Sequence, residues 1–288
     1  MEKFYHFANV DLAIQIEDAR MYRDDRNLAP FRAEPAPDPH RFLVEVTEQM
    51  APPQGPELAN YPGLRIYGAG DGYVRYQGPV QDGFAGAYAR TEHRGKQHHI
   101  GLSQDHTPGV VSVRQVLNAL DVEHLVAAEG GVILHASYVQ WQGRAILFTA
   151  PSETGKSTQA ELWKAHRDAR IINGDRAAVI LHNGQLCAAG LPFFGSSQYC
   201  ENVTSPLAAV VYLRQAPVTT IRRLRAAEAF RRIWEGCCVN PWNREDVGRA
   251  TSLVEMLLGH VPVYELSCTP DESAVTALEA QIRKQVTL

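Results

Sequence analysis

No stretch of this 288-residue chain approaches the roughly 20 consecutive apolar residues that cross a bilayer, so we expect no membrane-spanning helix and no membrane partner. The first residues, Met1 to Asp11, lack the apolar core of a secretory signal. Paired Cys-x-x-Cys motifs are also missing, and the five cysteines, at positions 187, 200, 237, 238 and 268, are an odd number. This pattern argues against a zinc knuckle or a disulfide framework and predicts reduced thiols in a cytoplasmic protein.

An excess of charge of either sign is missing too. The chain has 28 Lys and Arg against 32 Asp and Glu, a formal net charge of -4, and its pI is near 6.3. A broad basic surface is therefore not expected, and we predict no nucleic-acid partner. The hydrophobic share of 45% and the charged share of 21% are typical of a globular protein, with enough chain for one large domain or two moderate ones.

Residues 1–110 predict a β-rich (α+β) domain whose role the residues do not indicate. Short β-branched or aromatic runs alternate here with proline-rich connections; the clearest runs are Phe42–Val46, Leu64–Tyr67 and Tyr73–Tyr76. The glycines at 68, 70 and 72 have the spacing of a dinucleotide fingerprint, but they lie between two strand-like runs and open no helix. They predict a hairpin turn instead.

Four histidines of this half, at positions 93, 98, 99 and 106, raise the question of a metal site. Their charged and polar neighbours Arg94, Lys96 and Gln97 favour a solvated hairpin. We therefore assign no metal to them.

Residues 111–288 change to an α/β pattern, which we take as the second domain. Apolar residues recur at helical spacing from Val113 up to the stop signal Gly130-Gly131, and the strands Val132–Val139 and Arg144–Phe148 follow. Further along, the pattern predicts a helix from Ser157, strands near Ile171 and at Ala177–Leu181 and Leu207–Leu213, helices around 226–234 and 247–258, and a strand at Val261–Leu266. In the last helix, Thr269 is the expected cap and Glu272 completes a capping box.

The strand that ends at Phe148 runs into Thr149-Ala-Pro-Ser-Glu-Thr-Gly-Lys-Ser-Thr158, a small-residue loop that opens a helix. This is the context that a Walker A motif (P-loop) requires, although Ala150 stands where its first glycine usually does. Loop amides and the positive helix end favour phosphate there. Lys156 can bridge the β- and γ-phosphates, and the Ser157 hydroxyl can ligate Mg²⁺. The predicted nucleotide-binding residues are Ser152, Glu153, Thr154, Gly155, Lys156, Ser157 and Thr158.

Two further residues are candidates for the chemistry. Asp175 follows the apolar strand Ile171-Ile172, one strand–helix–strand unit past the loop, where a carboxylate can bind the metal or take a hydroxyl proton. A turn aspartate after Gly174 is the alternative. His135 lies in the strand before the loop, and a structural role for it stays open beside a catalytic one.

From Val132 to Leu213 the sequence resembles the kinase domain of the HPr kinase/phosphorylase superfamily, which is related to the phosphoenolpyruvate carboxykinases. The resemblance rests on Ile133–Ser137, the loop Ala150–Thr158, Ile171–Arg176, and Gly190–Gly195, which is similar to a Gly-x-Pro-Trp-x-Gly loop of related kinase-like proteins. It implies a P-loop α/β kinase domain and a histidine near the phosphates, at His135. That family has two aspartates after the loop; here Gly174 replaces the first, and Asp175 keeps the second.

The sequence thus predicts an ATP- and Mg²⁺-dependent kinase in which Asp175, Lys156 and His135 are catalytic, and Ser157 and Asp175 hold the metal. The acceptor is a hydroxyl on a small molecule, peptide or protein, which the resemblance does not identify. Two alternatives stay open: a P-loop NTPase switch, and a nucleotide-binding module without turnover. Assembly into a homo-oligomer is also left open.

Overall fold

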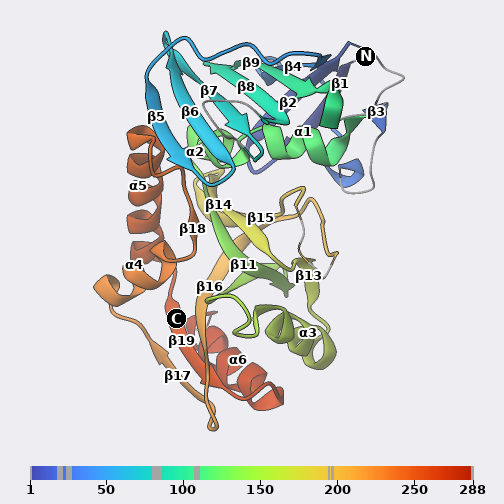
Figure 1. The fold of residues 1–288 in the computed structure, drawn as a ribbon. Coiled ribbons are helices and arrows are strands. Elements are labelled where there is room, and N and C mark those ends of the chain that lie inside the picture. The colour runs from blue at the N-terminus through green and yellow to red at the C-terminus, as the bar shows by residue number, and fades with distance from the viewer. Residues whose placement is uncertain are drawn as a thin grey trace. The chain divides into compact units, whose positions relative to one another are not determined.

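The computed structural model describes residues 2–17, 22–23, 28–79, 86–106, 111–193, 195 and 198–286. The chain divides into two compact units, unit 1 with Met1–His6 and Val10–Leu125, and unit 2 with Phe7–Asn9 and Val126–Leu288. The division falls inside helix α2 (Val122–Ala128), whereas the sequence placed a boundary after residue 110. Sheets dominate both units and helices are few, so the chain is a mixed α/β protein (Figure 1).

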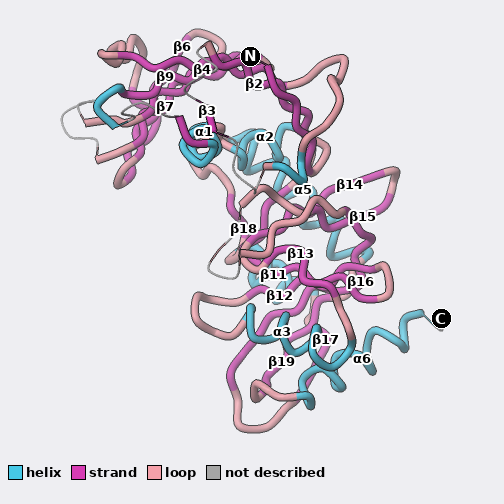
Figure 2. The backbone as a smooth tube through the Cα atoms, turned by 90° about the vertical axis from the view of Figure 1, so that its right-hand side faces the viewer, coloured by secondary structure: helices cyan, strands magenta, loops and turns pink. Residues whose placement is uncertain are grey.

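Unit 1 is built on one eight-stranded sheet in its described residues. In spatial order its strands are β1 (Glu2–Phe7), β2 (Val10–Ile16), β4 (His40–Thr47), β9 (Gln97–Ser103), β8 (Ala89–Arg94), β7 (Gly72–Gln77), β6 (Leu64–Ala69) and β5 (Glu57–Tyr61). The smaller elements are β3 (Tyr22–Arg23) paired with β10 (Val111–Ser112), two 3-10 turns (Ala29–Phe31 and Gln104–His106), and helices α1 (Val113–Ala119) and α2. In Figure 2 the magenta strands form a curved layer with α1 and α2 on one side. Strands β6 and β7 pair with Ala69 opposite Gly72, which confirms the predicted glycine hairpin.

The helical run expected from Val113 to Gly130 is divided into α1 and α2 at Asp121, whose φ is +57°. This backbone turn places the Asp121 carboxylate, almost wholly buried, against two side chains of β7. Tyr73 donates its hydroxyl to Asp121 Oδ2 at 3.0 Å, and Arg75 Nη1 lies 3.4 Å from the same oxygen. A buried charge pair needs such partners to offset its desolvation, so the helix break serves the packing of unit 1.

The predicted solvated hairpin at 93–99 is wrong for two of its histidines. His93 and His98 are 2% and 5% exposed, because they occupy the inward-facing positions of β8 and β9. The Nδ1 atoms of His93 and His98 lie 2.9 Å apart, and His98 Nε2 lies 3.0 Å from Nδ1 of His40. Burial, and then the neighbouring histidines, lower the pKa of both, to about 3 for His98. His99 faces outward, with Nε2 3.1 Å from Glu45 Oε1.

Unit 2 contains a mixed sheet with two long strands, β11 (Val132–Trp141) and β16 (Thr204–Gln215). Each of them pairs with different neighbours along its two halves, β16 with β15 near its start and with β12 and β19 further along. Strand β11 pairs with β12 along its second half and with β14 along its first. The parallel neighbours β12, β16 and β19 end at the same edge. The remaining strands are β12 (Arg144–Thr149), β13 (Arg170–Asn173), β14 (Arg176–His182), β15 (Gln185–Ala189), β17 (Thr220–Arg223), β18 (Cys237–Cys238) and β19 (Val263–Cys268).

Helices cover both faces of this sheet because its strands are apolar along most of their length and successive residues of a strand point to opposite faces. One face, with Leu134 and Leu147, packs against α4 (Ala226–Trp234) and α5 (Arg244–His260). The other, with Ile146 and Phe148, packs against α3 (Lys156–Arg167) and α6 (Glu272–Val286). Figure 1 shows the two helix pairs on opposite sides of the strands. Among the described residues, no helix has the length and apolarity that a membrane crossing needs.

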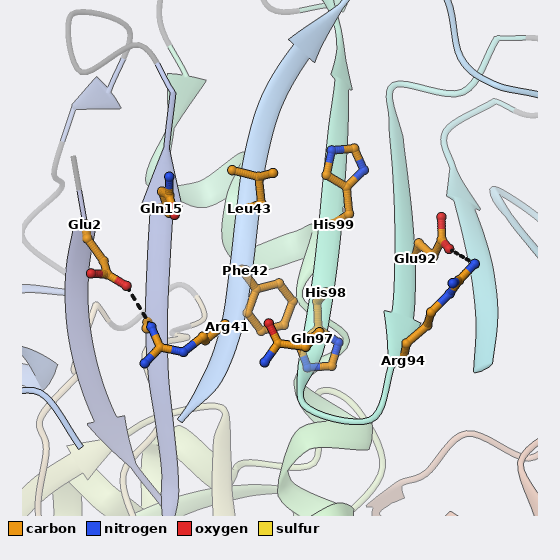
Figure 3. A pocket seen from close by; sticks show the side chains of 11 residues that line it. Glu2, Gln15, Arg41, Phe42, Leu43, Glu92, Arg94, Gln97, His98 and His99 are labelled. Atoms are coloured by element: carbon orange, nitrogen blue, oxygen red, sulfur yellow. Dashed lines mark hydrogen bonds and ion pairs between the residues drawn. The ribbon is translucent and has the colours of Figure 1, made fainter. Parts of the chain in front are cut away.

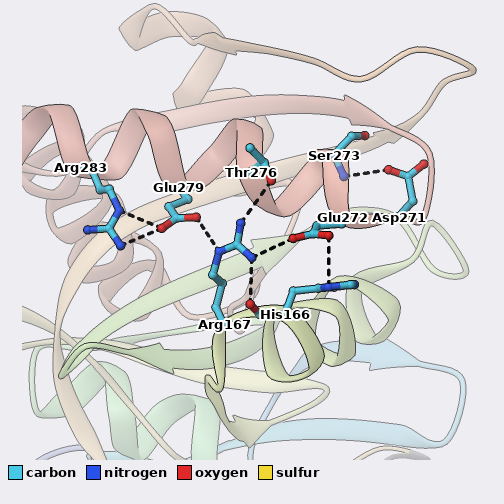
Figure 4. A network of polar contacts seen from close by, with 8 residues as sticks. All are labelled: His166, Arg167, Asp271, Glu272, Ser273, Thr276, Glu279 and Arg283. Atoms are coloured by element: carbon cyan, nitrogen blue, oxygen red, sulfur yellow. Dashed lines mark hydrogen bonds and ion pairs between the residues drawn. The ribbon is translucent and has the colours of Figure 1, made fainter.

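Polar contacts tie α3 to α6 (Figure 4). The Arg167 guanidinium donates to Glu279 at 2.5 Å, to Glu272 at 3.1 Å and to Thr276 at 3.2 Å. The start of α6 differs from the expectation, because Asp271 Oδ1 accepts the backbone N–H of Ser273 at 2.8 Å. Asp271 is therefore the capping side chain, and the predicted cap Thr269 donates its hydroxyl to Asp271 instead.

Candidate functional site

The turn from β12 into α3, which we call the 150–158 segment, follows directly from its sequence. Strand β12 ends at Thr149 and α3 begins at Lys156, with Gly155 as N-cap at φ +110°. Only glycine adopts this φ without strain, so Gly155 lets the helix start where it does. Glu153 also has a positive φ, +63°, although it carries a side chain. The first amides of α3 have no partner within the helix, which makes this end a favourable place for an anion.

Lys156 folds back over the segment. Its Nζ donates to the carbonyl oxygens of Ala150 at 3.0 Å and Pro151 at 3.3 Å, and the residue is 7% exposed. Burial lowers the pKa of Lys156, which the charge of Asp175 partly opposes. Two carbonyl dipoles are weak partners for a buried ammonium, so a bound anion would be a stronger one. Ser157 and Thr158, next along α3, are exposed.

The turn that carries Asp175 is shaped by Asn173, which is wholly buried at the end of β13. Asn173 Oδ1 accepts the backbone N–H groups of Asp175 and Arg176 at 2.9 and 3.0 Å. Its amide nitrogen donates to the carbonyls of Leu191 and Phe193. Asn173 therefore uses both of its donors and both acceptor positions, and it fixes the turn and the 191–193 loop together.

Asp175 and His135 meet across the site. His135 Nε2 lies 3.3 Å from Asp175 Oδ1, with His135 on β11 and Asp175 between β13 and β14. Burial, and then the nearby charge of Lys156, lower the pKa of His135. The imidazole is therefore neutral at pH 7, and the contact with Asp175 is a hydrogen bond rather than an ion pair. In this contact Nε2–H donates to the carboxylate, which leaves Nδ1 as the ring nitrogen that can accept a proton.

Two cavities adjoin opposite ends of the 150–158 segment. The larger, of about 630 Å³, lies at the carboxyl ends of β12, β16 and β19, against Glu153–Gly155 and Thr158. Its other walls include Leu213–Pro217 and Cys268–Pro270. The second, of about 370 Å³, is lined by His135 and Thr149–Ser152 on one side and by Tyr212, Arg232, Glu235 and Gly236 on the other.

Residues 99–269 match the family described as SynChlorMet cassette protein ScmC. This range covers the 150–158 segment, His135, Asp175 and both cavities, apart from Pro270 of the larger one. The chain belongs to the ScmC family.

Other comparisons add little to this ScmC-family assignment. No curated protein matches the chain. A solved structure, the HPr(Ser) kinase/phosphatase from Coxiella burnetii, is similar at 13% identity, over 54% of this chain and 90% of that one, with a TM-score of 0.33. A likeness this low carries no argument, so the resemblance seen in the motifs stays a prediction.

In this ScmC-family chain the structure brings three predicted catalytic residues, His135, Lys156 and Asp175, to one place. The predicted metal ligands are the exposed Ser157 hydroxyl and the Asp175 carboxylate. Among the described residues, no group of three or more His, Cys, Asp or Glu side chains is arranged to hold a metal. Phe194, part of the Gly190–Gly195 motif, lies outside the described residues.

The sequence patterns did not predict a role for Asn173, and they did not distinguish Arg232 from the arginines around it. The signal for Asn173 was the Asn-Gly-Asp order itself, since Asn side chains commonly cap the backbone two residues on. Arg232 lies among several arginines of the 222–232 region, and only its tertiary position sets it apart.

Unit 1 of the ScmC-family chain has a pocket of its own, of about 360 Å³, on the outer face of the sheet (Figure 3). Its arginines already have carboxylate partners. Arg41 Nη1 lies 3.0 Å from Glu2, and Arg94 Nη2 lies 2.7 Å from Glu92. Because these carboxylates neutralise the arginines, the charges that line the pocket do not favour a ligand of either sign.

Proposed function

We propose that this chain is a kinase that binds Mg²⁺-ATP at the 150–158 segment and transfers the γ-phosphate to a hydroxyl group. One observation carries the proposal: a buried lysine at a glycine-capped helix start lies in one site with a hydrogen-bonded His135–Asp175 pair. A lysine and a helix end serve phosphate, and a neutral imidazole beside a carboxylate serves proton transfer.

The nucleoside fits the 630 Å³ cavity, and the phosphates fit the segment. The cavity lies where three parallel strands end, the usual ligand position in α/β sheets, and its volume is within the range of small-molecule sites. Lys156 would exchange its two carbonyl partners for phosphate oxygens. This exchange replaces dipoles with a charge, so it strengthens as negative charge develops in the transition state.

Ser157 and Asp175 are the residues that would hold Mg²⁺. A hydroxyl and a single carboxylate fit this ion, because Mg²⁺ usually takes one or two protein oxygens and completes its shell with water and substrate phosphates. When bound, the ion supplies neutralisation of phosphate charge. The small number of protein ligands agrees with a site completed by the nucleotide.

In the transfer step the acceptor oxygen forms a bond to the γ-phosphorus, and the bond from that phosphorus to the β–γ bridging oxygen breaks. The electron pair leaves with ADP. The acceptor proton passes to the Asp175 carboxylate, whose turn is fixed by Asn173, and His135 Nε2, 3.3 Å from Asp175 Oδ1, donates a hydrogen bond that orients this carboxylate. Lys156 stabilises the oxygens that gain charge.

Incubation of the protein with γ-labelled ATP, Mg²⁺ and candidate acceptors tests this function. Label on an acceptor supports the kinase. Free phosphate alone indicates an NTPase switch, and intact bound ATP indicates a binding module. Lys156→Ala should abolish transfer with the fold intact by circular dichroism, since its ammonium serves the phosphates. A folded and fully active Lys156→Ala protein would contradict the proposal.

A further inference from the structure

The arginines of the 222–232 region differ sharply in what they contact. Arg222 is held by two carboxylates, with Nη2 2.6 Å from Glu228 and 2.8 Å from Glu265. Arg231 is exposed on α4. Arg232 instead lines the 370 Å³ cavity together with Ala150, Pro151 and Ser152. One cation of α4 therefore faces the start of the 150–158 segment.

Close backbone packing holds the end of α4 against this segment. Gly236 accepts the His135 N–H at 2.8 Å. A Cβ on Gly236 would lie 2.6 Å from Thr149 Oγ1, so any other residue here would force the Thr149 side chain to move. The helix that carries Arg232 is thus fixed beside both His135 and the loop, and the position of Arg232 does not depend on an exposed, freely moving segment.

The guanidinium of Arg232 is oriented but weakly paired. Its Cζ lies over the Tyr212 ring, 4.5 Å from the centroid. Nη1 makes two long contacts, each 3.4 Å, to the Tyr212 hydroxyl and to Glu235. Nε is buried with no hydrogen-bond partner among the described residues. A stack on tyrosine alone would explain the orientation, but it leaves a desolvated donor unsatisfied, which is unfavourable until an acceptor arrives.

The positions of the two cavities at opposite ends of the 150–158 segment indicate how a bound nucleotide would be oriented. If the nucleoside occupies the cavity at Glu153–Gly155 and Thr158, the phosphate chain runs along the segment toward Ala150–Ser152. Its outermost phosphate then faces the cavity that Arg232 and His135 line. Arginine is suited to phosphate because its planar fork donates two parallel hydrogen bonds.

We propose that Arg232 binds the terminal phosphate of a nucleoside triphosphate, so that the 370 Å³ cavity is the γ-phosphate side of the site. This rests on the proposed nucleotide-binding function. Arg232 exchanges its long contacts with Glu235 and the Tyr212 hydroxyl for phosphate oxygens, while the ring stack keeps its plane. A diphosphate ends short of Arg232 and makes no such contact.

Calorimetric titration of the full-length protein with Mg²⁺-ATP and with Mg²⁺-ADP tests this. Arg232→Ala should weaken ATP binding by about 10- to 100-fold, the range of a charge-assisted hydrogen bond in a desolvated site, and ADP binding by less than about 3-fold. Arg232→Lys keeps the charge without the fork and should recover part of the loss. Arg231→Ala removes the same charge from the exposed neighbour, so both affinities should stay within about 2-fold of wild type.

Equal weakening of ATP and ADP, or no change in either, would overturn the assignment of Arg232 while leaving nucleotide binding in place. A wild-type protein that binds neither nucleotide would overturn the proposed function, and this inference with it. Arg232→Gln, which keeps most of the side-chain volume over Tyr212, replaces Arg232→Ala if circular dichroism shows that the alanine variant is misfolded. The same ATP-selective loss is then expected.

Discussion

Glu153→Gly removes two features of the 150–158 segment at once, a strained backbone conformation and a negative charge, and each has its own measurable effect. Glu153 has φ +63°, a conformation that costs a residue with a side chain about 1–2 kcal/mol. Glycine removes that strain but adds about 0.5–1 kcal/mol of entropy to the unfolded chain. The free energy of unfolding of unit 2 should therefore rise by about 0 to 1.5 kcal/mol. The four tryptophans, at positions 141, 163, 234 and 242, all lie in unit 2, so fluorescence-monitored denaturation reports it.

The charge of Glu153 should act on nucleotide binding. The side chain is exposed and borders the cavity proposed for the nucleoside, so its repulsion of a triphosphate is screened by water and salt. We expect Glu153→Gly to tighten Mg²⁺-ATP binding about 2- to 5-fold at low ionic strength and less than about 2-fold near 0.15 M. Calorimetry at the two ionic strengths measures this. Glu153→Ala loses the charge but keeps the strained φ, so it should share the change in affinity without the gain in stability.

Glu161→Gln is a matched control, since it removes one exposed acidic charge further along α3. It should change ATP affinity less than Glu153→Gly does. A large loss of affinity or transfer in Glu153→Gly would refute this reasoning. It would show that the carboxylate is a working metal ligand, and that the assignment of Mg²⁺ to Ser157 and Asp175 alone is wrong.

Asp175→Asn should lower turnover by roughly 10²–10⁴ with ATP binding retained, because the metal ligand and proton acceptor lose their charge; near-normal turnover in a kinetic assay would make Asp175 a turn residue only. Asn173→Asp keeps the oxygen that caps the turn but puts a second oxygen against the two carbonyls that now accept from the Asn173 amide. The free energy of unfolding of unit 2, followed by tryptophan fluorescence, should therefore fall by roughly 2–5 kcal/mol. Unchanged stability would contradict the four hydrogen bonds assigned to Asn173. His93 and His98 have pKa values lowered by burial, so below about pH 6.5 the unfolded chain gains protons that unit 1 does not. Unit 1 should then lose stability as the pH falls below 6.5, by about 1.4 kcal/mol per pH unit from His98 down to about pH 3 and by a further amount in the same direction from His93. Amide exchange of β8 and β9 measures this, and equal protection at pH 7 and 5 would contradict it.

Local patterns predicted many elements because their causes are local. Gln142-Gly143 between two apolar runs predicted the β11–β12 hairpin, which the register from Ala136–Thr149 to Trp141–Arg144 confirms. The glycines before Tyr73 predicted the β6–β7 hairpin in the same way. Turn geometry depends on a few adjacent residues, so the sequence is sufficient there.

Burial within unit 1 was not predicted, because it depends on partners far along the chain. Polar neighbours made His93 and His98 look solvated, yet alternate residues of a strand face opposite sides of the sheet. The strands that flank them decide which side is covered. The break at Asp121 was missed for the same reason, since its partner Tyr73 lies 48 residues away.

By itself, the sequence determined the strand–loop–helix order around Lys156 and the glycine that lets α3 begin there, since a positive φ at one position needs only that residue. The tertiary structure alone decided that His135 and Asp175 lie 3.3 Å apart. It also decided that Arg232, among several similar arginines, faces the 150–158 segment. Contacts between elements distant in the chain are set by the packing of whole sheets and helices, which no short pattern of residues encodes.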